Sequence, residues 1–424
     1  MLRTPLLAAT ALVLSFAGPV LADCTMTIGS VVSLTGPAGP YGQAAARSIE
    51  LAFHDINGSG GVRVGEQTCM LAVDVRDAQS QGTVAVDAAR QLVDLKKVPV
   101  IIGGIISSVS IPILTSVTAP SGIVQVSPAS SSPTLTELAR KGESKGWFFR
   151  TITSDALQGV AAAKHAIDSG LTRLSVIHVN NDFGRNMIRE FQPAFEKMGG
   201  TVLSVTPYNE SQPSYAAEVT QAMAGEPDAL YLISYPGDGA TIARQWISQG
   251  GPQKFLLNDG MNSAEFITNV GAEHLNDAFG TSSGTTATPS TEYFNSVYKD
   301  WTGGQFEPGA PAADRAYDAA AIVGLAIARA GSVEPAAIRD SIRSVVASGG
   351  TVVHAGPEGM KQALTLIGEG KPVRYVGVIG PVQFDQYGDI TGPFRLWRMQ
   401  NGEVTTVGQM SEEDVAKLKA ELAG

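Results

Sequence analysis

The feature that most constrains the fold is a regular alternation of short β-branched segments with longer, alanine-rich amphipathic segments. The short segments are apolar throughout, as is typical of parallel strands buried on both faces, and the longer ones have the period of helices that cover such a sheet. Strands are predicted over residues 26–32, 71–75, 98–102, 123–126, 174–178, 202–205, 229–233 and 254–257. Helices are predicted over residues 42–57, 84–95, 110–119, 156–169, 185–199, 215–223, 239–249 and 264–270. The pattern predicts an α/β fold with two doubly wound parallel sheets.

The 424 residues are too many for one ordinary hydrophobic core and indicate two lobes. A charged segment before residue 147 and a Thr/Ser/Gly-rich segment at 281–290 are typical of crossovers between sheets. Further helices are predicted over 292–301, 311–330 and 335–345, and strand-like runs over 382–385 and 394–399. The most economical path returns this third segment to the first lobe. We therefore expect residues 23–151 and 285–381 in lobe I, and 152–284 and 382–424 in lobe II.

The N-terminus resembles an export signal. Arg3 supplies a positive charge, residues 6–16 form a short apolar run, and a small-residue site ends at Ala22. The run is too short to span a bilayer. We predict a signal peptide at residues 1–22, cleavage after Ala22, and a periplasmic protein that is not inserted in the membrane. The alternative, a lipid anchor on Cys24, is disfavoured because Asp23 is not the small residue that a lipoprotein signal requires.

Two cysteines, Cys24 and Cys69, each open an apolar, β-branched stretch. If these stretches are neighbouring parallel strands that begin at the same sheet edge, the two sulfur atoms come within bonding distance. In an oxidising compartment we expect a structural disulfide that contributes about 3–4 kcal/mol. The alternative is a pair of buried free thiols.

Charge and motifs exclude several functions. The formal net charge is -10 and the sequence has no run of Lys or Arg, so it has no basic segment that would bind nucleic acid or an anionic membrane. Residues 142–146 match a nucleophile-elbow pattern, but their charged surroundings are not a strand–turn–helix. Residues 237–239 lack the third glycine of a dinucleotide loop. We predict no enzymatic activity, no cofactor and no metal.

Loops that follow the predicted strands carry the candidate site, because ligands of open parallel sheets bind beyond the carboxyl ends of the strands. In the first half, the loops at 103–108 and 127–133 are rich in glycine and serine. Hydroxyls and free backbone N–H groups at helix N-termini can hold a small anion such as a carboxylate. The alternative for each serine is ordinary N-capping.

In the second half, the strand ends supply aromatic rings and an acid, at 180–184, 234–238 and 258–260. An acid that faces a carboxylate-binding loop across a cleft indicates a zwitterionic ligand whose ammonium group contacts Asp259. The alternative for Asp259 is an N-cap of the helix that follows.

Several motifs follow one another along the mature chain. They are Asp55-Ile56-Asn57-x-x-Gly60-Gly61-Val62, Arg76-Asp77-Ala78-Gln79-Ser80, Ser127-Pro128-Ala129, Arg150-Thr151 with Asp155, Phe183-Gly184 and Ala316-Tyr317-Asp318-Ala319. In this order they resemble the periplasmic leucine/isoleucine/valine-type (branched-chain amino acid) binding proteins of ABC transporters. The resemblance implies a type I periplasmic binding fold, in which two lobes joined by three crossovers close on a ligand. It also implies a membrane ABC permease as partner, and we expect a monomer.

The resemblance assigns polar roles where the residues match. Ser107 and the N–H of Ser131 correspond to the carboxylate-binding groups. The carbonyl of Ala129, the hydroxyl of Ser131 and Asp259 correspond to the ammonium-binding groups.

It also assigns three aromatic residues, Tyr41 from the first lobe and Phe183 and Tyr235 from the second. Ser131 stands where the family carries Thr, Phe183 where Tyr is frequent, and Asp259 replaces a longer Glu. The ligand expected by default is a branched-chain or other hydrophobic amino acid. Alternatives are an aromatic or other carboxylic acid or amide in the same cleft, a sensory ligand-binding module, and a hydrolase on the same sheets.

Overall fold

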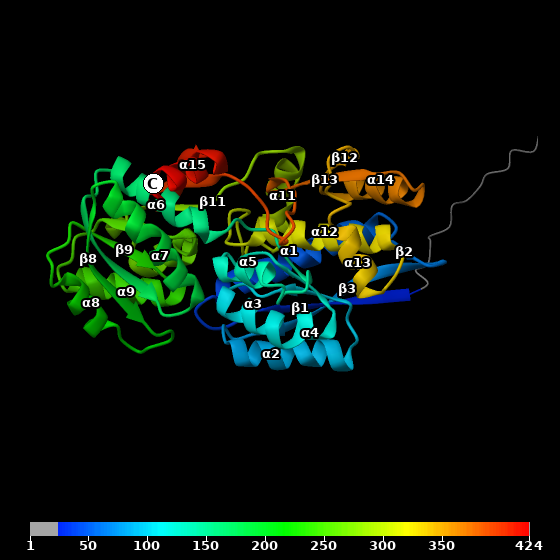
Figure 1. Ribbon diagram of the computed structural model, residues 1–424, viewed down its shortest axis with the longest axis horizontal. Helices are drawn as coiled ribbons and strands as arrows, with labels where there is room; N and C mark the ends of the chain where they lie inside the picture. The colour runs from blue at the N-terminus through cyan, green and yellow to red at the C-terminus, as the bar shows by residue number, and fades with distance from the viewer. Residues whose placement is uncertain (1–23, 424) are drawn as a thin grey trace, which may run out of the picture.

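The computed structural model describes residues 24–423 and shows two α/β lobes side by side (Figure 1). The predicted signal peptide and its cleavage after Ala22 lie outside these residues. The first sheet has the strand order β2-β3-β1-β4-β5-β6. Its strands are β1 (Cys24–Val32), β2 (Val62–Val64), β3 (Gln67–Asp77), β4 (Val100–Gly103), β5 (Val124–Ser127) and β6 (Phe148–Arg150).

The second sheet has the order β16-β15-β11-β10-β9-β7-β8. Its strands are β7 (Arg173–Val179), β8 (Thr201–Tyr208), β9 (Ala229–Ile233), β10 (Phe255–Leu257), β11 (Phe279–Ser283), β15 (Phe394–Gln400) and β16 (Glu403–Met410). A small third sheet contains β12 (Thr351–Val353), β13 (Val373–Gly377) and β14 (Gly380–Pro381). The α/β prediction is confirmed.

Both large sheets are mixed rather than purely parallel, which corrects the sequence prediction. β2 runs antiparallel to β3, β15 antiparallel to β11, and β16 antiparallel to β15. Two of the antiparallel pairs, β2–β3 and β15–β16, are joined by two residues, which is too short for a helical crossover, whereas β15 meets β11 after the chain has returned from the first lobe. The predicted strand at 382–385 is also wrong, since only Phe384 pairs there, in a single bridge with Ile390.

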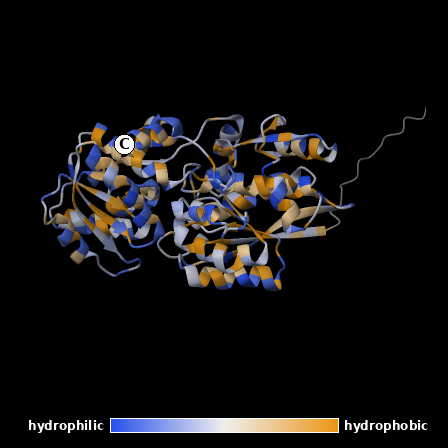
Figure 2. Cartoon of the chain, viewed as in Figure 1, coloured by the Kyte–Doolittle hydropathy of each residue, from blue (hydrophilic) through white to orange (hydrophobic). Residues whose placement is uncertain are grey.

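Helices cover both sheets and turn their apolar sides inward, while their polar sides face outward (Figure 2). The first lobe carries α1 (Gly39–Gly58), α2 (Gly82–Arg90), α3 (Ser107–Ile113), α4 (Ala119–Ser121) and α5 (Pro133–Arg140). The second carries α6 (Asp155–Asp168), α7 (Asp182–Lys197), α8 (Ala216–Met223), α9 (Pro236–Ser248), α10 (Ala264–Val270) and α15 (Glu412–Ala423). Two of the predicted helices contain π-helical turns, at Gln91–Leu95 and Leu114–Thr118.

The segment after the second sheet returns to the first lobe (Figure 1). It comprises α11 (Pro289–Trp301), α12 (Ala313–Ala330), α13 (Pro335–Ile342) and α14 (Pro357–Gly368), of which α11, α12 and α14 pack on α1. The alanine-rich sequence of α12 allows this close packing, because small side chains let helix backbones approach. The path is the one inferred from the sequence; the precise lobe boundaries stay predictions.

Cys24 and Cys69 form the predicted disulfide. The two residues are direct partners in the parallel register of β1 and β3, with Cα atoms 4.5 Å apart. Because the Cys24 sulfur is bonded to Cys69, it is not available for a lipid thioether.

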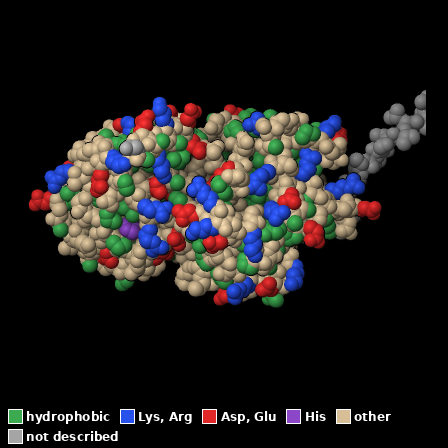
Figure 3. Space-filling model, in the orientation of Figure 1, with side chains coloured by type: hydrophobic (Ala, Val, Ile, Leu, Met, Phe, Trp, Pro, Cys, Tyr) green, Lys and Arg blue, Asp and Glu red, His purple; other side chains and the backbone are tan. Residues whose placement is uncertain are grey.

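Lys and Arg side chains are interspersed with Asp and Glu on the face shown in Figure 3, without a continuous basic patch. No single helix among residues 24–423 is long and apolar enough to cross a bilayer, and α12 and α13, which meet that criterion only together, are bent by 116°.

Candidate functional site

All seven residues predicted to bind ligand line one small cavity between the lobes. They are Tyr41, Ser107, Ala129, Ser131, Phe183, Tyr235 and Asp259, joined by Ile105, Ile106 and Asn258. The cavity volume is about 20 Å³, room for a water-sized group. The convergence follows from the parallel topology, which brings the loops after β4, β5, β7, β9 and β10 to facing sheet edges.

The first-lobe wall is built from two loops that are hydrogen-bonded to each other. The Gly104 carbonyl accepts hydrogen bonds from the hydroxyls of Ser110, Ser127 and Ser130, at 2.6–2.8 Å. Gly104 has φ +72°, a conformation that favours glycine, and an added Cβ would meet Ser110 Oγ at 1.8 Å. These buried serines are therefore structural, which leaves Ser107 and Ser131 as the hydroxyls that line the cavity.

Ser107 and Ser131 are held in place by specific partners. Ser107 Oγ accepts from the Ser132 N–H at 3.1 Å, a bond that ties the two loops together. Ser131 Oγ donates to Asp155 Oδ2 at 2.8 Å, and its carbonyl accepts from the Asp155 N–H. Because the Ser131 proton is directed to Asp155, the lone pairs of its oxygen are left to accept from a donor in the cavity.

Asp155 is a site residue that sequence reasoning quoted in a motif but gave no role. It begins α6, is fully buried, and its Oδ1 has no hydrogen-bond partner among the described residues. Burial raises the pKa of this carboxyl well above its usual value, and the nearby Asp259 raises it further. The only sequence signal was an acid at the start of an apolar helix, and its contact with Ser131 could not be read from the sequence.

The second-lobe wall presents two stacked aromatic rings. Phe183 and Tyr235 have ring centroids 5.7 Å apart and an interplanar angle of 25°. The Asn181 side chain caps α7 by accepting from the Gly184 N–H, and it donates to the Tyr235 hydroxyl at 3.2 Å. One asparagine therefore positions both rings.

Asp259 lies on the second-lobe side and faces the cavity. Its Oδ1 accepts from Asn258 Nδ2 at 3.1 Å and from the Gly260 N–H at 3.0 Å. Burial raises its pKa above the usual value for a carboxyl. The N-cap alternative is wrong, because Ser263 caps α10 by accepting from the Phe266 N–H. Tyr41 lies near this acid, since burial and the Asp259 charge both raise the Tyr41 pKa well above its usual value.

Direct hydrogen bonds join the two walls. Asn186 of α7 donates to Ser132 Oγ at 2.8 Å and to Thr134 Oγ1 at 3.1 Å across the cleft. Thr153, which follows β6, and Ser283, which ends β11, share a 2.7 Å hydrogen bond between their hydroxyls. The lobes are in direct contact beside the cavity through Asn186.

Arg150, at the end of β6, fixes the back of the first-lobe wall. Its Nη1 donates to the carbonyls of Ser130 and Ser132, and its Nε pairs with Asp389 Oδ1 at 2.7 Å. The Arg150 side chain is fully buried.

Among the described residues, no group of three or more His, Cys, Asp or Glu side chains is arranged to hold a metal ion.

Comparisons with known proteins agree with this architecture. The sequence model of a family described as periplasmic binding protein matches residues 25–365. A Leu/Ile/Val-binding protein homolog from Brucella melitensis is 24% identical over 398 residues, 93% of this chain and 96% of the relative.

Two solved structures show the same fold. A leucine-binding protein from Thermotoga maritima aligns with a TM-score of 0.75 at 24% identity, over 92% of this chain and 100% of the other. A solute-binding protein of an ABC transporter from R. palustris, in complex with 4-hydroxybenzoate, aligns with a TM-score of 0.72 at 17% identity, over 91% of this chain and 97% of the other.

Proposed function

Because the chain belongs to the periplasmic binding protein family, we propose that it captures a small α-amino acid between its lobes and delivers it to the permease of an ABC importer. The family is one of solute-binding proteins, so the non-enzyme prediction is confirmed on that ground. The observation that carries the proposal is the opposition of hydroxyls and an acid across one cavity, Ser107 and Ser131 facing Asp259.

The polar groups match the two ends of a zwitterion. The α-carboxylate would accept from the Ser107 hydroxyl and the Ser131 N–H, and the α-ammonium would donate to the Ala129 carbonyl, Ser131 Oγ and Asp259. Charge-assisted hydrogen bonds of this kind contribute roughly 1.5–3 kcal/mol each. Asp155 adds a second carboxyl beneath Ser131, and a cationic group at this end of the cavity would favour its ionised form.

Capture requires movement of the lobes, since the closed cavity of about 20 Å³ does not admit an amino acid. A ligand shifts an open–closed equilibrium only through contacts that the open form lacks. Phe183, Tyr235 and Asp259 from the second lobe supply those contacts, because the first-lobe wall is held together by its own hydrogen bonds. A micromolar ligand requires about 8 kcal/mol of binding free energy, within the range of such contacts.

The experiment is isothermal titration calorimetry on ligand-depleted protein with matched ligand pairs. L-Leucine is compared with 4-methylpentanoate, L-phenylalanine with 3-phenylpropionate, and L-glutamate with glutarate, because the members of each pair differ by the amine. We expect the amine-bearing member to bind, and Asp259→Asn to weaken its binding by about a hundredfold. The control is Asp277→Asn, an exposed acid of the second lobe.

Tighter binding of the amine-free members, or of 4-hydroxybenzoate, would contradict the proposal and favour the carboxylic-acid alternative. Unchanged affinity in Asp259→Asn would remove the assigned ammonium contact. Periplasmic location after signal cleavage, the permease partner and the monomeric state remain predictions, which export assays, co-purification and native mass spectrometry test.

A further inference from the structure

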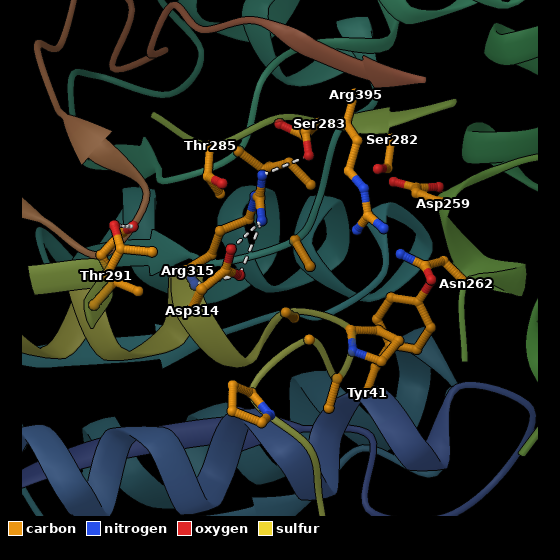
Figure 4. Close-up of a pocket in the computed structure, with 18 of the residues that line it drawn as sticks. Tyr41, Asp259, Asn262, Ser282, Ser283, Thr285, Thr291, Asp314, Arg315 and Arg395 are labelled. Carbon is orange, nitrogen blue, oxygen red and sulfur yellow. Dashed lines mark hydrogen bonds and ion pairs between the residues drawn. The ribbon is translucent and has the colours of Figure 1, made fainter. Parts of the chain in front are cut away.

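A second, larger cavity adjoins the small one, and three residues line both. Its volume is about 440 Å³, and Tyr41, Ala129 and Asp259 form the shared boundary (Figure 4). The small cavity, about 20 Å³ as it stands, is lined by the groups assigned to the polar head of the ligand and leaves no room for a side chain. The remainder of a bound amino acid would therefore extend past the shared residues into the larger space.

One cation in the larger cavity has unused donors. Arg395 of β15 anchors its Nε on Thr406 Oγ1 at 2.8 Å. Among residues 24–423, its terminal nitrogens form no hydrogen bond and no ion pair, and Figure 4 shows the guanidinium pointing into the cavity toward Asn262. Burial lowers the Arg395 pKa below its usual value, which reflects a charge that is poorly solvated.

The other charges of this cavity have partners. Arg315 Nη1 contacts both oxygens of Asp314, at 2.8 and 2.9 Å, and its Nη2 donates to the carbonyls of Ser283 and Gly284. Asp259 is assigned to the ligand ammonium by the proposed function. Among the described residues, Arg395 is then the one charge of this cavity that forms no ion pair, although the nearby Asp314 carboxylate, itself paired with Arg315, favours the charged form of Arg395.

An aliphatic side chain would leave this half-buried guanidinium without an ionic partner and would cover it further from water, which is unfavourable because a desolvated charge needs a counter-ion. A carboxylate at the far end of the ligand would accept from the planar guanidinium, and the Asn262 amide lies beside it (Figure 4). The apolar residues of the same cavity, Ile152 and the prolines Pro308 and Pro311, would cover the methylene groups between the two ends.

We infer that the larger cavity holds a second, anionic end of the ligand at Arg395, so that the captured solute is an α-amino dicarboxylate. This rests on the proposed amino-acid function and replaces its default aliphatic ligand.

The test uses isosteric ligand pairs that differ by a single charge. L-Aspartate is titrated against L-asparagine and L-glutamate against L-glutamine, with L-2-aminoadipate for length and L-leucine and L-valine as the aliphatic reference. We expect at least one acidic member to bind at least tenfold more tightly than its amide and than leucine. Arg395→Gln should remove this preference, and Arg395→Lys should retain part of it, since lysine keeps the charge without the planar fork.

Arg173→Gln, an exposed arginine of the second lobe, is the control, and the melting temperature of each ligand-free variant verifies folding. Tighter binding of leucine or of the amides than of the acids overturns the inference while the proposed function stands. An acidic preference that survives in a folded Arg395→Gln variant also overturns it. If no amino acid binds the wild-type protein, the proposed function fails, and this inference with it.

Discussion

The two walls of the cleft are built in different ways. The first-lobe wall is held from behind, by three serine hydroxyls on the Gly104 carbonyl and by Arg150 on the carbonyls of Ser130 and Ser132. The second-lobe wall consists of Phe183 and Tyr235, which rest on each other and on Asn181. A rigid wall presets the geometry of a polar head group, and a lightly bonded wall supplies the contacts that appear on closure. Substitutions behind the first-lobe wall should therefore affect folding, and substitutions of the second-lobe aromatic residues should affect ligand capture.

The largest expected effect concerns the rigid wall. Arg150→Met should lower the free energy of unfolding by about 3–5 kcal/mol, because Asp389 and two buried carbonyls lose their partner. Urea denaturation measures this loss, and Arg90→Met, at an exposed position, should stay within about 0.5 kcal/mol of wild type. A loss for Arg150→Met as small as that of the control would show that this wall is not anchored from behind.

On the second-lobe wall, Tyr235→Ala should weaken ligand binding by about 2 kcal/mol, roughly thirtyfold, because an aromatic contact made on closure is lost. Tyr235→Phe keeps the ring and loses the bond to Asn181, so its affinity should fall by about 1 kcal/mol or less. Calorimetry with the tightest ligand measures both variants. Equal losses of ligand affinity in the two variants would show that the Tyr235 hydroxyl, and not its ring, makes the contact that matters for binding.

The pH dependence of binding should follow the acids that face the hydroxyls. Burial raises the pKa of Asp259, so this carboxyl protonates at a pH above the ordinary carboxyl range of about 4. As the pH falls through that raised pKa, an ammonium ligand loses its partner, and affinity should decline by up to about tenfold per pH unit. Calorimetry from about pH 4, the ordinary carboxyl range, up to pH 8 should show this for an amine-bearing ligand and not for its amine-free counterpart. Equal pH dependence of the two ligands would contradict Asp259 as the ammonium partner.

The smallest expected effect is at the bond that joins the two walls. Asn186→Ala removes the donor to Ser132 and Thr134, and the closed form should lose about 1 kcal/mol, so ligand affinity falls about fivefold. Small-angle scattering of the ligand-free variant should show a larger radius of gyration than wild type. An unchanged radius would show that this bond does not hold the lobes together.

Much of the fold follows from the apolar runs, because parallel strands buried on both faces leave little ambiguity. The strand Ala229–Ile233 has the predicted limits, and Cys24 and Cys69 pair because their strands start in register. The ligand loops meet for the same reason, since the strands end at facing sheet edges. The strand prediction at 382–385 is wrong because the alternating pattern Val-Gln-Phe-Asp does not reveal whether a partner strand lies beside it.

Two residues of the site required coordinates. The contact of Asp155 with Ser131 depends on how α6 is oriented after the crossover, which no local pattern specifies. Arg395 comes from an antiparallel strand, β15, whose register against β11 and β16 decides which side chains face the cavity. Both are single charged residues whose position in the site depends on the packing of a helix or on the register of a strand, and neither belongs to a motif with a chemical signature.

The hydrogen bond between Thr153 and Ser283 has a mechanical consequence. It fastens two of the connections between the lobes side by side, while Arg150 fastens the third connection to the first lobe through Asp389. Sliding of one lobe past the other would break these bonds, whereas rotation about a line through them would not. If the lobes open by rotation about this line, the rim of the cleft opposite Thr153 moves farthest.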